Sequence, residues 1–156
     1  MNKVLLTISI ALLALTNAQA QDDKKVTDEE LLRYAVTMDS INEMSASVRN
    51  MIADMVKESK VITAARYNEL SKIMNDEARL ADAKATAEEI AFLKEVADKK
   101  AAETARINET YQAMAKEYVT PPVFNKVKKA LVEEPELKTK YDSLITEMSR
   151  DNPDKH

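Results

Sequence analysis

Residues 27–58 decide the fold, and they read TDEELLRYAVTMDSINEMSASVRNMIADMVKE. The segment opens with a capping box, in which the side chains of Thr27 and Glu30 would each accept a hydrogen bond from the other's backbone N–H. Apolar residues then recur at steps of three and four, the spacing of one helix face. No proline or glycine interrupts them. The segment therefore predicts a helix from residue 28 to about residue 58, roughly 45 Å long.

The apolar stripe of this helix is named here the first seam. Its members are Leu31, Tyr34, Met38, Ile41, Val48, Ile52 and Met55, with Ser45 in the one gap. Burying each such side chain contributes roughly 1.5–3 kcal/mol, so the stripe will not stay in water. A stripe of this kind predicts lengthwise packing against a second long helix.

The second long helix is predicted between Glu77 and Tyr118, with a bend near Thr86, because that span has no proline or glycine. Its stripe is Ile90, Leu93, Ala97, Ile107, Tyr111, Met114 and Tyr118, and it is weakened in the middle by Lys100 and Thr104. Thr63 caps a short helix that ends near residue 75. Pro121-Pro122 and Pro135 each open a further helix, since proline is tolerated in a first helical turn.

The composition supports an all-α fold. The 156 residues include no glycine and no cysteine. Without glycine, tight hairpins and phosphate-cradling loops are disfavoured; without cysteine, no disulfide can form. We predict one helical domain over residues 27–150, in which two long antiparallel helices have short helices packed across them. Residues 21–26 are expected to be flexible and residues 151–156 disordered.

The chain also shows an internal duplication. Residues 63–80 align without gaps to 120–137 at an offset of 57, and the matched motif residues are Tyr67 with Phe124, Asn68 with Asn125, and Leu80 with Leu137. The long helices open alike at an offset of 59, since Thr27-Asp-Glu-Glu-Leu31 matches Thr86-Ala-Glu-Glu-Ile90. Repeat units over about 27–85 and 86–150 explain both matches; chance similarity of two capped helices is the alternative. The two asparagines are interpreted as hydrogen-bond partners of the preceding loop, with ligand contact as the alternative.

Three short motifs resemble a known family. They are Tyr34-Ala35 in the first long helix, Val123-Phe124-Asn125-Lys126-Val127, and Glu134-Pro135-Glu136-Leu137. Together they look like the bacterial exported domain-of-unknown-function family 4168, and the resemblance covers most of the chain after residue 20. It implies an exported helical domain and supplies no activity.

The N-terminus is typical of a cleavable signal peptide over residues 1–20. Lys3 gives a positive start, Val4 to Leu15 is a short apolar run, and Ala18-Gln19-Ala20 is a small-x-small cleavage site. A membrane-spanning helix needs about 20 apolar residues, so this run is too short for one. We expect a periplasmic or secreted protein with no membrane span after cleavage; an uncleaved anchor is the alternative.

Several function classes are disfavoured. The formal net charge is −4, which argues against general nucleic-acid binding. The only histidine is the last residue, His156, so neither a Ser–His nucleophile nor a usual zinc site is available. Adjacent carboxylates such as Glu88 and Glu89 do not face each other on a helix. The sequence therefore predicts no enzyme, no catalytic residues, no metal site and no cofactor.

Methionines give the one distinctive surface. Met44, Val48, Met51 and Met55 lie on the first seam or at its border, and Met51 and Met55 are one helical turn apart. Methionine is a common core filler and also makes adaptable binding surfaces. We expect a non-enzymatic envelope protein that works by association with itself or with another envelope protein. The alternative is a periplasmic ligand or copper carrier, because thioethers bind Cu(I).

The signal peptide leads to a first testable prediction. The chain recovered from the envelope of its native host should begin at Gln21, because cleavage is expected after Ala20. Intact-mass spectrometry of the purified protein measures this. Recovery of the chain with residues 1–20 still attached would contradict the prediction of export by this route.

Overall fold

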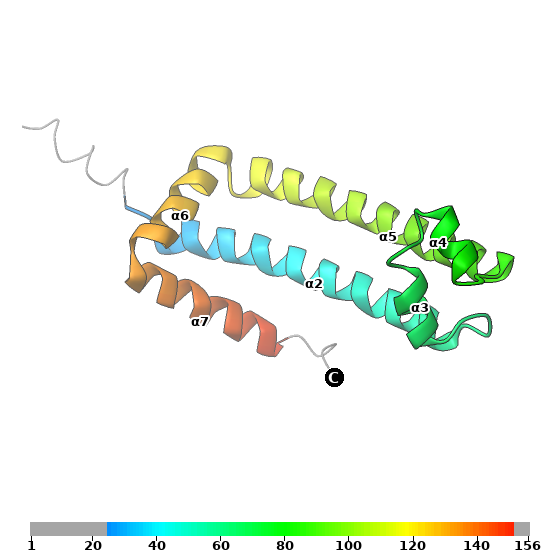
Figure 1. Cartoon of the computed structure of the whole chain (residues 1–156). Helices are drawn as coiled ribbons and strands as arrows, with labels where there is room; N and C mark the ends of the chain where they lie inside the picture. The colour runs from blue at the N-terminus through cyan, green and yellow to red at the C-terminus, as the bar shows by residue number, and fades with distance from the viewer. Residues whose placement is uncertain (1–24, 152–156) are drawn as a thin grey trace, which may run out of the picture.

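A computed structural model describes residues 25–151 and confirms the all-α prediction. Within that range six α-helices and one short π-helix form, and there is no strand. The two long helices, α2 (Asp28–Glu58) and α5 (Ala87–Ala113), lie side by side and antiparallel (Figure 1). The predicted signal peptide and most of the predicted tail lie outside the described residues.

Helix α2 begins and ends where the sequence predicts. The Thr27 hydroxyl accepts a hydrogen bond from the Glu30 N–H at 3.2 Å, and the Glu30 carboxylate accepts one from the Thr27 N–H at 2.8 Å. Val26, the last residue of the segment expected to be flexible, is 8% exposed and belongs to the core. The capping box therefore starts the helix directly beside the core.

The region between the long helices differs from its prediction. Two short helices, α3 (Ala64–Leu70) and α4 (Glu77–Asp82), precede α5. Thus the helix expected from Glu77 onward is broken at residues 83–86, where Lys84 has a φ of 52°. Thr86 and Glu89 form a second capping box, which starts a new helix. This local hydrogen bonding gives a helix start where the sequence suggested only a bend.

The C-terminal part returns along α2. Helix α5 continues into a π-helical turn, η1 (Met114–Tyr118), followed by α6 (Pro121–Glu133) and α7 (Pro135–Asp151). Pro121 begins α6 and Pro135 begins α7, as predicted. Before α6, Thr120 turns the chain with a φ of 75°. Figure 1 shows α6 across one end of the long pair and α7 running alongside the first half of α2.

Two separate hydrophobic clusters form the core, one at each end of the long helices. The first consists of Val26, Leu31, Tyr34, Val127 and Ala130, with α7 side chains packed on it. The second consists of Ile62, Leu70, Leu80 and Leu93. Between them no residue of α2 from Ser40 to Met55 is buried. The middle of the molecule is therefore thinly packed.

The face that α5 turns inward is largely the predicted one. Within the predicted stripe Leu93 is 2% exposed, and the half-buried members are Ile90, Ala97, Ile107, Tyr111 and Met114. Lys100 and Thr104, the two positions that weaken the stripe, are exposed, which avoids the cost of burying an unpaired ammonium group. Val96 was not part of the predicted stripe but is 1% exposed.

The second core cluster leads to a stability prediction. Leu70 is 0% exposed, so Leu70→Ala should lower the free energy of unfolding by about 2–5 kcal/mol. Leu32 on α2 is 43% exposed, and the matched Leu32→Ala variant should cost well under half as much. Urea denaturation followed by circular dichroism measures both. Equal losses would show that the cluster at Leu70 is not a core.

Candidate functional site

The predicted repeat motif places an aromatic ring of each short helix against the start of the opposite long helix. Phe124 of α6 lies 4.9 Å from Tyr34 of α2, and Tyr67 of α3 lies 6.5 Å from Phe92 of α5, both measured between ring centroids. Tyr34 also contacts Tyr141 of α7 at 5.9 Å. Each ring pair therefore joins one predicted repeat unit to the other.

A charged pair accompanies each ring pair. Lys126 of α6 contacts the Glu30 carboxylate at 2.5 Å, and Arg66 of α3 contacts the Glu89 carboxylate at 3.0 Å. Both glutamates are the capping-box residues of long helices. Arg66 also donates to the Ala83 carbonyl at 2.8 Å, which holds the turn before α5. Each of the two carboxylates thus caps a long helix and also binds a basic side chain of a short helix.

These contacts change the acidity of both carboxyl groups. Burial raises the pKa of Glu30, but the hydrogen bonds from Lys126 and Thr27 outweigh it, so the net pKa is below 4.5. The hydrogen bond from Arg66 and that from the Thr86 N–H hold the pKa of Glu89 below 4.5 as well. Both groups are therefore bound as carboxylates in the folded protein.

Asn68 and Asn125 are exposed and line two shallow hollows of about 680 and 920 Å³. Neither side chain makes a hydrogen bond within the described part of the chain, so the expected bonds to the preceding loop do not form there. Five lining positions of the two hollows match at the offset of 57. They are Ala65 with Pro122, Asn68 with Asn125, Glu69 with Lys126, Lys72 with Lys129, and Ile73 with Ala130.

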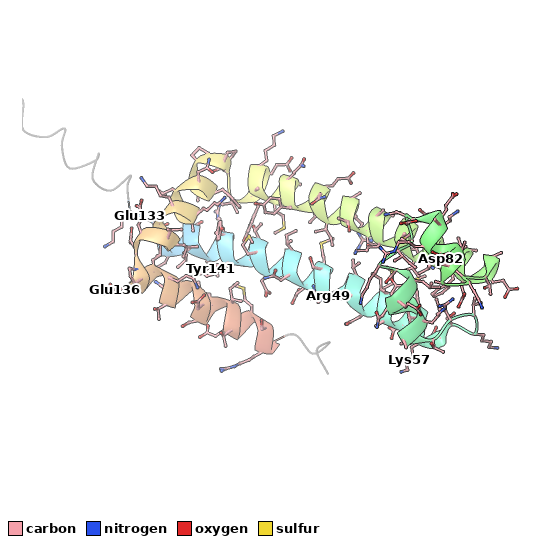
Figure 2. All side chains as sticks on the ribbon, viewed as in Figure 1. Arg49, Lys57, Asp82, Glu133, Glu136 and Tyr141 are labelled. Carbon is pink, nitrogen blue, oxygen red and sulfur yellow. The ribbon has the colours of Figure 1, made fainter. Side chains whose placement is uncertain are left out.

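The two hollows have mixed charge and lie at opposite ends of the molecule. Asp82 lines the first and Glu133 the second, and Figure 2 shows them far apart. Acidic and basic side chains alternate in both, for example Lys72 near Asp82, and Lys129 paired with Glu133 at 3.8 Å. No single sign of charge dominates, so neither hollow resembles an anion or cation site.

The methionine surface predicted on α2 lies in the thin middle of the molecule. Met44, Val48, Met51 and Met55 are all half-buried, and neither core cluster includes them. Of the matched leucines of the motif, Leu80 belongs to the second cluster and Leu137 packs against the first. The structure thus places the two leucines in the packing at the ends and the methionine surface, only partly covered, between them.

A third hollow lies along α5 and was not anticipated from the sequence. It has a volume of about 710 Å³ and runs from Tyr67 and Met74 past Leu93, Ala97, Lys100 and Ala101. Ala97, Ala101 and Ala105 repeat at intervals of four residues, which would have indicated a smooth strip on one helix face. Of these three alanines, only Ala97 belongs to the predicted stripe of the second long helix.

Residues 25–151 contain no group of three or more His, Cys, Asp or Glu side chains that could hold a metal ion. In the same range no helix has both the length and the apolar character needed to cross a bilayer. Comparison of the chain with known protein families, with curated proteins and with solved structures finds no match.

The two carboxylates lead to a pH prediction. Because the folded pKa of Glu30 and Glu89 lies below 4.5, they stabilise the fold above that pH, and the contribution is lost as the pH falls through the folded values. The free energy of unfolding should therefore decrease as the pH falls below about 4.5. In Glu89→Gln this acid decrease should be smaller, whereas in Glu88→Gln it should match the wild type. An unchanged decrease in Glu89→Gln would contradict the assignment.

Proposed function

We propose that this protein is exported and acts in the cell envelope by protein–protein association, without enzymatic activity. Export is supported by the N-terminal signal pattern and by the resemblance to family 4168. The absence of cysteine and the single, terminal histidine support a non-enzymatic role. The partner is a second copy of the chain or another envelope protein.

The observation that supports association most is the incomplete cover of α2. Its first seam is buried at Leu31 and Tyr34, but from Met38 to Met55 every seam residue is only half-buried. The binding surface proposed is Met44, Val48, Met51 and Met55. Partly exposed apolar side chains gathered on one helix favour contact with another molecule. Methionine suits such a contact because its unbranched side chain adapts to different partners.

Copper or ligand carriage is the second candidate. Met51 and Met55 are one helical turn apart and both remain partly exposed, so two thioethers are available together. A carrier would show bound copper in protein purified from its native envelope. An association protein would not, and it would instead lose its partner when the apolar surface is made charged.

Charge substitution on α2 tests association. In Val48→Glu/Met51→Glu two half-buried apolar groups become carboxylates, so binding to a partner should fall at least about tenfold, while the helical content is kept. Sedimentation velocity measures self-association, and capture from envelope extracts measures another partner. Copper titration of the same variant tests the copper-carrier alternative, because the variant lacks the Met51 thioether.

The matched control is Asn50→Glu/Ala53→Glu. These two residues are exposed, have the same spacing of three and receive the same two charges. The control should associate like the wild type. A monomeric wild type that captures nothing would refute the proposal. Unfolding of the Val48→Glu/Met51→Glu variant alone would also count against it, because the residues would then be ordinary core.

A further inference from the structure

The α5 hollow matches a place in the other half of the molecule that is filled. One end of this hollow is lined by Leu93, Tyr67 and Met74. At the offsets of 59 and 57 the corresponding residues are Tyr34, Phe124 and Leu131. Tyr34 belongs to the first core cluster, and Phe124 and Leu131 pack against it together with Tyr141 and Leu144 of α7. Figure 2 shows Tyr141 where α7 faces α2.

The reason for the difference is the length of one helix. At the offset of 57 the start of α4 matches the start of α7, and Leu80 packs in one cluster as Leu137 packs in the other. Helix α7 then continues to Asp151, whereas α4 ends at Asp82 and the chain turns away at Lys84. Because α4 is so short, no helical residues corresponding to Tyr141 and to those that follow it lie over α5.

The surface left open on α5 suits a helix. Ala97, Ala101 and Ala105 form a strip of small side chains, along which another helix backbone can approach closely. The hollow contains one charged group, Lys100, and this ammonium group has no ion-pair partner within residues 25–151. Its counterpart on α2 at the offset of 59 is Ile41. A helix that binds here needs an apolar face like that of α7, together with a carboxylate opposite Lys100.

The position of that carboxylate follows from the contact between α7 and α2. The two helices run in the same direction, with Tyr141 against Tyr34. Because both rise by about 1.5 Å per residue, Met148, seven residues after Tyr141, lies level with Ile41, seven after Tyr34. In a helix seated on α5 in the same way, the residue seven positions after the aromatic one would therefore lie beside Lys100.

We propose that the α5 hollow binds an amphipathic helix of another protein, with a large apolar anchor against the half-buried Tyr67 and Met74 and an acidic side chain seven residues later at Lys100. A second copy of this chain is a poor occupant. Its own α7 packs on its own α2, and the outward face of α7 is polar, with Lys138, Asp142 and Thr146 exposed. This site is distinct from the α2 surface, so either can fail without the other.

A peptide with the sequence of residues 135–151, carrying Met148→Glu and a fluorescent label, serves as the probe. It should bind the full chain, and about two- to fivefold more tightly than the same peptide with Met148, because a partly exposed ion pair adds a modest gain. Protein with Lys100→Glu should reverse the preference and bind a Met148→Lys peptide better. Fluorescence anisotropy measures all of these affinities.

Two alanine variants locate the binding. Ala101 and its neighbour Ala102 are both exposed, and only Ala101 lines the hollow. Ala101→Arg should weaken binding at least about tenfold, while Ala102→Arg should leave it within about twofold; arginine is a good helix former, so both should keep the fold. No binding up to about 1 mM would overturn the proposal. So would binding that is unaffected by Ala101→Arg, because the peptide would then have displaced α7 from α2.

Discussion

The pairing of each capping-box glutamate with a basic side chain of a distant short helix is the interaction on which the rest of the structure depends. Glu30 caps α2 and binds Lys126, and Glu89 caps α5 and binds Arg66. A carboxylate that accepts both a backbone N–H and a charged donor is held in a fixed position, because charge-assisted hydrogen bonds are shorter and stronger than neutral ones. Helix start and short-helix position are therefore fixed together, at both ends of the molecule.

Fixing the ends in this way concentrates the apolar packing there. The aromatic pairs Tyr34–Phe124 and Tyr67–Phe92 lie beside the two charged pairs, and the two core clusters surround them. The middle of α2 depends on contact with α5 and part of α7, and its apolar side chains stay half-exposed. Most of the stability should therefore come from the ends of the molecule.

The two predicted repeat units differ in the length of one helix. Where α7 continues for 17 residues, α4 stops after six, and the face of α5 that would be covered by a longer helix remains open. The molecule therefore presents two unlike apolar surfaces, one rich in methionine on α2 and one rich in alanine on α5. Methionine adapts to varied shapes, whereas a strip of alanines selects for close approach of a helix.

The sequence by itself determined where most helices start and stop, because caps and prolines act within about four residues along the chain. The capping box at Thr27, the end of α2 at Glu58, and the helix starts at Pro121 and Pro135 were all predictable. It also indicated the matched pairs such as Asn68 with Asn125, but not the hollows around them. Only the tertiary structure decided the burial of Val96 and the contact of Arg66 with Glu89. These depend on which face of each helix meets its neighbours, and that choice is set by packing among residues far apart in the chain.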